Sequence, residues 1–305
     1  VYVDCSYFEK TIKENFNVKV ININKIKYER LNYFKRIINL HLYISYQIIY
    51  RSIQFILSNI LFSQIKFNKL NKIFIIEIFS IPNFEAKDRY FNNLYDYVNK
   101  KLRDKIFFVP TITYTSIIRL FRTYFLLKKS KNKYIIKDNY LKFNDVLLSI
   151  FYCYRILKLN FKCYCKKYEL ELNFLILSEI NNLSSTNISI EAHINFHFIK
   201  RLKENEIKLE LFLDWWENQS LDKGLALAMS LYYKKVKHIG YLGYAPRKFE
   251  LQLSPTVLEK KLKLIPNTIA VIGKYYIDQV KMLDNSINVI VAPAFRYNYL
   301  WSIKK

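Results

Sequence analysis

The segment from residue 213 to residue 224 brings acids, amides and tryptophans together in a short space. Its sequence is LDWWENQSLDKG. The residues before it alternate between polar and apolar as in a β-strand, and the residues after it have the apolar spacing of a helix. In open α/β sheets, ligands bind at the carboxyl ends of strands, where a strand leads into a helix. The sequence therefore predicts a functional site in this segment.

The side chains of this segment are of the types that hold sugars. Sugar rings pack against flat aromatic faces such as that of Trp216, and we expect Asn218 and Gln219 to hydrogen-bond to sugar hydroxyls. Glu217, and after it Asp214, are the candidates for a general base or a nucleophile. The structural alternative is that the acids cap the following helix, whose first N–H groups favour carboxylates, and that the tryptophans are core residues.

Two further segments carry candidate substrate-binding residues. Gly240 and Gly243, with Tyr244, follow a strand-like run, and such a loop can bring backbone N–H groups close to a phosphate or a sugar. Asp138 lies in a polar run that follows apolar residues, where it either faces the cleft or belongs to an ordinary turn. Lys223, in the helix after the tryptophans, completes the expected substrate-binding set. For the glycine loop, the alternative is a plain turn.

No metal site and no cofactor is expected. The chain has four cysteines, Cys5, Cys153, Cys163 and Cys165. They lack the two pairs of closely spaced ligands that zinc sites use, so we expect reduced thiols. His193 and His197 share a helix face, but the glutamate of the zinc-protease motif is missing, so we interpret them as structural histidines.

The chain is strongly basic, with a formal net charge of +24. It is rich in Lys, Asn, Ile and Tyr and has only 4 glycines, which is typical of an AT-rich genome. No compact basic block with interleaved aromatic residues is present, so we expect no specific nucleic-acid binding. A basic surface favours anionic partners such as lipid headgroups, nucleotide phosphates or acidic glycans.

The composition does not fit an integral membrane protein. Hydrophobic residues make up 51% of the chain, but the most apolar long segment, residues 43–62, contains Gln47, Arg51 and Gln54 and fits a helix of a folded domain better than a membrane span. Residues 1–20 lack the apolar stretch of a signal peptide. We expect a cytoplasmic protein, with peripheral contact to an anionic inner membrane as a further expectation. A chain that begins at Val1 is compatible with a fragment of a longer protein.

Strand-like and helix-like runs alternate along the chain, which predicts an α/β fold with a mostly parallel, Rossmann-like sheet covered on both faces. The expected strands are residues 17–24, 72–79, 106–109, 173–177, 207–213, 238–241, 268–273 and 287–291. The expected helices are residues 26–62, 87–101, 114–127, 144–158, 190–202, 225–233 and 275–283.

The pattern restarts near Pro266. We therefore expect residues 1–264 to form an N-terminal, acceptor-side Rossmann-like domain. Residues 265–305 are then the crossover and the first βαβ unit of an incomplete C-terminal, donor-side domain. One βαβ unit cannot cover its own sheet, so it either packs on the first domain or lacks its remainder.

Several motifs between residues 107 and 301 follow one another in a characteristic order. They are FVPT at 108–111, KDNYL at 137–141, DWWENQ at 214–219, DKG at 222–224, GYLGY at 240–244, SP at 254–255 with Glu259, IP at 265–266, VIG at 271–273 and APAFRY at 292–297. In this order they resemble a family of bacterial surface-carbohydrate (O-antigen type) biosynthesis proteins that are themselves similar to GT-B glycosyltransferases.

The resemblance implies two facing Rossmann-like domains, with the acceptor held mainly by the first and a nucleotide-sugar mainly by the second. The implied activity is metal-independent transfer of a sugar from the nucleotide-sugar to a glycan or lipid-linked acceptor at the inner membrane face. The chain departs from this pattern because it stops inside the expected second domain. The alternatives are a non-catalytic glycan- or membrane-associated scaffold of the same fold and, from a third class, a basic nucleic-acid-binding protein.

Overall fold

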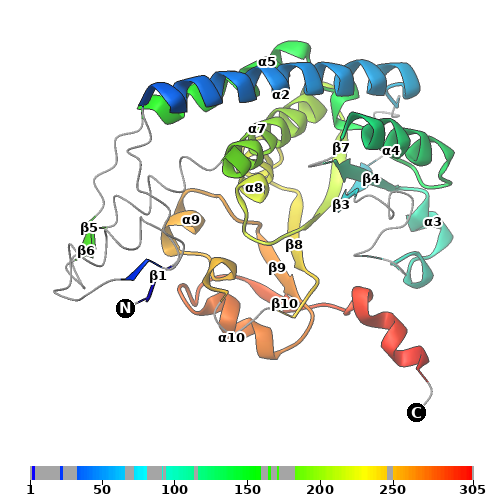
Figure 1. Cartoon of the computed structure of the whole chain (residues 1–305). Helices are drawn as coiled ribbons and strands as arrows, with labels where there is room; N and C mark the ends of the chain where they lie inside the picture. The colour runs from blue at the N-terminus through cyan, green and yellow to red at the C-terminus, as the bar shows by residue number, and fades with distance from the viewer. Residues whose placement is uncertain are drawn as a thin grey trace. The chain divides into compact units, whose positions relative to one another are not determined.

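The structure is a computed structural model of the chain, shown in Figure 1. It describes residues 2–3, 21–22, 33–65, 72–80, 91, 94–112, 116–158, 164–165, 170–171, 183–245 and 250–303. The chain divides into two compact units, one of residues 1–49 with 147–190 and the other of residues 50–146 with 191–305.

The first unit has two short pairs of strands. β1 (Tyr2–Val3) pairs in parallel with β2 (Ile21–Asn22), and β5 (Tyr164–Cys165) pairs antiparallel with β6 (Leu170–Glu171). The strand expected at 173–177 lies outside the described residues, and only residues 21–22 of the strand expected at 17–24 are described.

The second unit is built on a six-stranded, all-parallel sheet in the order β10-β9-β8-β7-β3-β4. The strands are β3 (Lys72–Phe79), β4 (Ile106–Thr111), β7 (Lys208–Trp215), β8 (Lys237–Leu242), β9 (Thr268–Val271) and β10 (Val289–Val291). Numbered along the chain, the order is 2-1-3-4-5-6, which is the flavodoxin-like order with one added strand. The direction of winding therefore reverses between β3 and β7, and this switch point is where such sheets bind ligands.

Helices connect the strands. They are α2 (Tyr33–Leu61), α3 (Lys100–Arg103), α4 (Ile117–Lys129), α5 (Phe143–Phe151), α7 (Leu183–Glu204), α8 (Ser220–Tyr232), α9 (Val257–Lys261) and α10 (Tyr275–Lys281). Shorter 3-10 turns are η1 (Leu94–Tyr97), η2 (Lys137–Asn139), η3 (Tyr152–Lys158), η4 (Leu251–Leu253) and η5 (Phe295–Ser302). The expected alternation of strands and helices is confirmed over most of the described residues. The exception is the helix expected at 87–101, whose described residues hold the 3-10 turn η1 and only the start of α3, at Lys100.

Side chains alternate across the central strands, so neighbouring residues enter different cores. Trp215 and Tyr241 lie in one core with Leu120 and Tyr124 of α4. Trp216 and Leu242 lie in another core, with Val280 of α10. The two adjacent tryptophans therefore point to opposite faces of the sheet.

The expected boundary at residue 264 does not divide the sheet. β9 pairs in parallel with β8, from Ile239 opposite Thr268 to Leu242 opposite Val271, and β10 pairs with β9. The physical reason is that β9 is buried at every position, which requires a strand on each side and helices on its faces. The sequence leaves open whether this segment packs on the first domain or lacks its remainder. Residues 265–303 pack on the first sheet.

Residues 43–61 belong to α2, in which Gln47, Arg51 and Gln54 are buried. These polar side chains face the protein interior, as expected for a helix of a folded domain. Among the described residues, no helix is long and apolar enough to cross a membrane.

Candidate functional site

The carboxyl ends of β7 and β8 form the edge that carries most of the expected site residues. Trp215, the last residue of β7, lies opposite Tyr241, and the N–H of Trp216 donates to the carbonyl oxygen of Tyr241 at 3.1 Å. Glu217 and Gly243 follow these strands directly and therefore share one edge of the sheet. The expectation that residues 214–218 lie at a strand's carboxyl end is confirmed.

Glu217 is half-buried, and both of its carboxylate oxygens accept hydrogen bonds. Trp215 Nε1 donates to Oε1 at 2.7 Å, and Gln219 Nε2 donates to Oε2 at 2.8 Å. A carboxylate has about four lone-pair positions, so each oxygen keeps capacity for one more donor. Glu217 is thus held in a fixed orientation while it can still accept a hydrogen bond from a ligand hydroxyl.

Aromatic rings surround this carboxylate. Trp215 stacks on Tyr244, with ring centroids 6.2 Å apart at 26°, and meets Tyr241 edge-on at 5.8 Å. Burial, followed by the negative charge of Glu217, raises the pKa of the Tyr244 phenol. A phenol is protonated at neutral pH in any case, and the raised pKa extends this to more alkaline pH, so Tyr244 can donate a hydrogen bond.

The two glycines serve packing, and they differ from the expected loop in that Gly240 lies within β8 and only Gly243 follows it. A Cβ on Gly243 would lie 2.2 Å from a ring carbon of Trp215, and a Cβ on Gly240 would lie 2.8 Å from Cβ of Trp216. No side chain fits at either position without displacing a tryptophan. Trp216 itself is fully buried, as in the alternative in which it is a core residue.

The side chain of Asp222 fixes the conformation of the loop between β7 and α8. One oxygen of this buried carboxylate accepts the backbone N–H groups of Glu217, at 3.0 Å, and of Gln219, at 2.8 Å. Asp222 therefore accepts the N–H of Gln219, the residue that caps α8, and that of Glu217 before it. It has the carboxylate role at the helix start that the sequence leaves open for Glu217 or Asp214. Burial, reinforced by the negative charge of Asp214, raises the pKa of Asp222.

Asn218 and Lys223 tie the loop to the segment before α9. Asn218 has a left-handed backbone with φ of 55°, and its Nδ2 donates to the carbonyl oxygen of Gln252 at 2.7 Å. Lys223 Nζ donates to Oδ1 of Asn218 at 3.1 Å and forms an ion pair with Glu259. Both expected substrate-binding residues are thus engaged in holding the loop.

Asp214 lies below the edge and is fully buried. Its Oδ1 lies 3.1 Å from Nε2 of His238, and its Oδ2 has no hydrogen-bond partner among the described residues. A substrate at the edge cannot reach this carboxylate in the observed packing, so Glu217 is the better placed of the two acids.

A buried ion pair lies on the same face of the sheet as Asp214. Lys137 Nζ lies 3.6 Å from Glu77 on β3 and donates to Oδ1 of Asn195 on α7 at 2.6 Å, and Thr111 also donates to Glu77. Burial raises the pKa of Glu77 to about 7, against the opposing charge of Lys137. This network joins β3, β4, η2 and α7 beneath the switch point.

Asp138 belongs to a second buried cluster and not to the edge around Glu217. Its Oδ2 accepts hydrogen bonds from Gln54 Nε2 and from the Tyr124 hydroxyl, both at 3.1 Å. Arg51 forms an ion pair with Glu191 in the same cluster and donates to Oε1 of Gln54 at 3.0 Å. These side chains surround a small cavity beside the carboxyl end of β4.

Sequence reasoning did not select Arg51, Glu77, Lys137, Glu191 and His238 as functional candidates. The sequence feature that could have identified them is a charged residue inside an apolar run, as for Glu77 in KIFIIEIF. Such a residue is almost never fully buried unless it is paired. The partners lie on other elements, so the pairing itself is visible only in the structure.

The described residues contain no cluster of His, Cys, Asp and Glu side chains that could hold a metal ion. Comparisons with protein-family models, with curated proteins and with solved structures find no match to this chain.

Proposed function

We propose that the carboxyl edge of β7 and β8 binds a sugar, and that the protein is a GT-B-like glycosyltransferase of bacterial surface polysaccharide (O-antigen or capsule) biosynthesis. The observation that carries the proposal is the orientation of Glu217. Its carboxylate is held by Trp215 Nε1 and Gln219 Nε2 beside the stacked rings of Trp215 and Tyr244, at the strand ends next to the switch point. Sugars are commonly held by a flat aromatic surface together with carboxylate and amide groups, and here the half-buried Tyr244 ring, packed on the buried Trp215, is the aromatic face open to a ligand.

In this proposal Glu217 acts as the general base. Its free lone pair takes the proton from a hydroxyl of a glycan or lipid-linked acceptor as that oxygen attacks the anomeric carbon of a nucleotide-sugar. The bond from the anomeric carbon to the diphosphate oxygen breaks, and its electron pair leaves with the nucleoside diphosphate. In this proposal the Tyr244 hydroxyl, protonated at neutral pH like other phenols, donates a hydrogen bond to a sugar oxygen.

The test is Glu217→Gln in the full-length protein. The amide keeps the size of the side chain but cannot take a proton, so release of nucleoside diphosphate from a panel of nucleotide-sugars with glycan and lipid-linked acceptors should fall by about 10²–10⁴-fold. The control is Glu210→Gln, an exposed carboxylate of the same strand that pairs with Lys105 at 3.9 Å, and it should leave turnover unchanged.

The second candidate function is a non-catalytic glycan-binding scaffold of the same fold. The contacts that favour it are those that occupy Glu217, Asn218 and Lys223 with neighbours within the protein. A scaffold would bind a glycan, lose that binding when the half-buried Tyr244 is changed to Ala, and show no turnover with any donor. Turnover in the wild type that survives Glu217→Gln would contradict the catalytic role of Glu217.

A further inference from the structure

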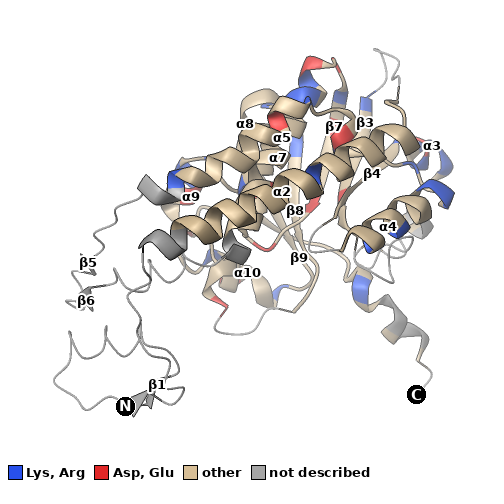
Figure 2. Ribbon diagram, turned by 45° about the horizontal axis from the view of Figure 1, so that its top comes forward, with Lys and Arg blue, Asp and Glu red and all other residues tan. Residues whose placement is uncertain are grey.

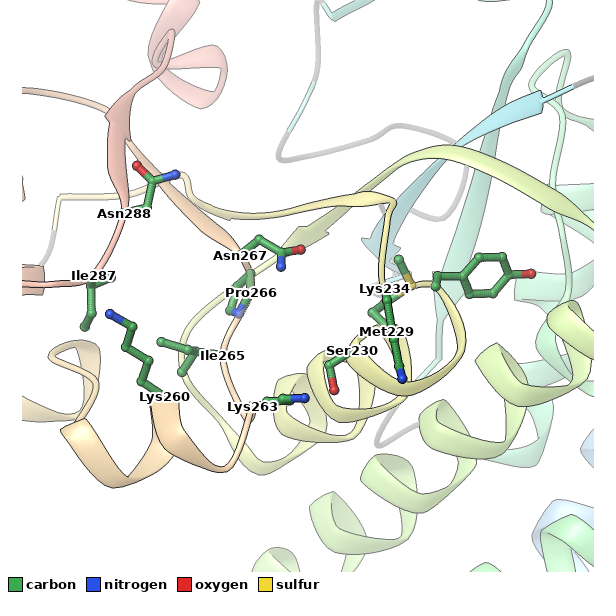
Figure 3. Close-up of a pocket in the computed structure, with 11 residues that line it drawn as sticks. Met229, Ser230, Lys234, Lys260, Lys263, Ile265, Pro266, Asn267, Ile287 and Asn288 are labelled. Atoms are coloured by element: carbon green, nitrogen blue, oxygen red, sulfur yellow. The ribbon is translucent and has the colours of Figure 1, made fainter.

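A pocket lies at the opposite, amino-terminal edge of the sheet (Figure 3). It is lined by the end of α8 and the turn after it, by the segment from α9 to β9, and by Ile287 and Asn288 before β10. Its volume is about 400 Å³, within the usual range for small-molecule sites. β8 separates this pocket from Gly243, and a strand of this length spans roughly 20 Å. The pocket is therefore distinct from the edge around Glu217.

Three lysines from different segments line the pocket: Lys234 after α8, Lys260 on α9 and Lys263 in the turn that follows. None of the described residues that line it is acidic. Lys260 Nζ donates to the carbonyl oxygen of Ser286 at 2.7 Å, whereas Lys234 and Lys263 have no hydrogen-bond or ion-pair partner within the described part of the chain. Figure 3 shows Lys234, Lys263 and Ser230 in the same part of the pocket.

The end of α8 balances only part of this charge. A helix C-terminus carries about half a negative elementary charge, and its effect fades within the last turn. The charge of a single lysine is enough to compensate it. Hydrogen bonds from Ser286, and after them the nearby positive charge of Lys260, lower the pKa of the Asp284 carboxyl, so the charge of Lys260 is partly balanced. The three lysines together still leave a net positive charge, which favours an anion in the pocket.

A second hollow continues the positive surface along the same edge. It is lined by Lys72 and Lys208, which begin β3 and β7, by Lys203 and Lys235, and by Glu206, the single acid among its described lining residues. Figure 2 shows the described basic residues of the chain in blue. The positive electrostatic field therefore extends beyond the first pocket. Such a field favours a ligand with more than one negative charge, such as a phosphate.

The remaining wall of the first pocket is apolar. Met229, Ile265, Pro266 and Ile287 form it, and Asn267 adds an amide. An anion alone would leave this surface without a partner. We infer that the pocket between α8, α9 and β10 binds a phosphate-bearing ligand that carries an apolar or aromatic group, with the phosphate at Lys234 and Lys263. This inference does not depend on the proposed transferase activity.

The test compares probes of the two parts of such a ligand. Calorimetric titration of the full chain at low salt should show phenyl phosphate binding several-fold more tightly than inorganic phosphate, because only the former covers the apolar wall. A second arm measures sedimentation with vesicles of phosphatidic acid and phosphatidylcholine, since a lipid headgroup supplies the same phosphate chemistry. Binding of phenyl phosphate alone identifies a soluble ligand, and binding of the vesicles identifies a lipid.

The variant is Lys263→Gly combined with Lys234→Gln. Lys263 has a left-handed backbone with φ of 59°, which glycine adopts without cost, so the substitution removes the charge without straining the turn. The matched control is Lys100→Gln with Lys101→Gln, two exposed lysines of α3 that change the net charge by the same amount. The pocket variant should bind the probe about tenfold more weakly, and the control should bind as the wild type does.

Two outcomes would overturn the inference. One is an equal loss of affinity in the pocket variant and the control, which would mean that the overall charge attracts the probe. The other is the absence of saturable binding of both phenyl phosphate and phosphatidic acid vesicles to the wild-type chain. If the pocket variant still binds phosphate as tightly as the wild type does, the inference is overturned in the same way as by the first outcome.

Discussion

The two edges of the same sheet carry opposite chemistry. At the carboxyl edge, Glu217 and Lys223 are held by hydrogen bonds or an ion pair within the protein. At the amino edge, Lys234 and Lys263 are exposed and have no such partner among the described residues. A fixed carboxylate suits chemistry that needs orientation, whereas free ammonium groups suit the attraction of an anion. The comparison predicts that substitutions near the carboxyl edge change stability and that those at the amino edge change only binding.

The largest effect on the free energy of unfolding is expected for Lys137→Met. This change leaves Glu77 buried without its ionic partner, and breaking a buried ion pair typically costs about 3–5 kcal/mol. Urea unfolding at pH 8, where Glu77 is largely ionised, measures it. Lys208→Met at the amino edge is the control and should stay within about 0.5 kcal/mol of the wild type. Equal effects of the two substitutions would remove the contrast between the edges.

The second prediction concerns pH. The pKa of Glu77 rises from 4.5 to about 7 on folding. As pH rises from 4.5 to about 7, the unfolded chain releases this proton first, so the folded state loses stability, by about 3 kcal/mol from this group. Glu77→Gln should remove this part of the slope in unfolding experiments across that range. An unchanged slope in the variant would show that Glu77 has an ordinary pKa in the folded protein.

A smaller loss of stability is expected when Gly243, which packs against the Trp215 ring, is substituted. Gly243→Ala forces a Cβ to within 2.2 Å of the Trp215 ring and should destabilise the protein by about 1–3 kcal/mol. Gly273→Ala is the matched control, because its nearest atoms lie at 3.7 Å, in ordinary contact. Thermal unfolding with tryptophan fluorescence measures both. If the control melts as early as Gly243→Ala, the tight contact beside Trp215 is not what matters.

The smallest effect is expected at the amino edge. Lys234→Gln removes an exposed charge without a partner, so the free energy of unfolding should change by less than about 0.5 kcal/mol. The same urea experiment measures it. A larger loss would mean that Lys234 stabilises the end of α8, and the amino edge would then resemble the carboxyl edge.

Much of the fold follows from local patterns. Three local patterns specify elements that depend on nearest neighbours and on burial: the near-continuous apolar run KIFIIEIF, the alternation in the strand before Trp215, and the apolar spacing of residues 190–202. The placement of residues 265–303 is different. Their strand and helix were expected, but whether they open a second sheet or extend the first depends on pairing with β8, which is a long-range contact.

The sequence by itself determined that Glu217 lies at the end of a strand, because alternation stops there and a helix begins. Only the tertiary structure decided what the neighbouring polar residues do. Asp214 is buried against His238, and Asp138 lies with Gln54 and Tyr124. The physical reason is that a buried charge is tolerated only when partners surround it, and these partners come from elements far apart in the chain. Patterns within one segment record burial, but they do not record which distant side chains meet.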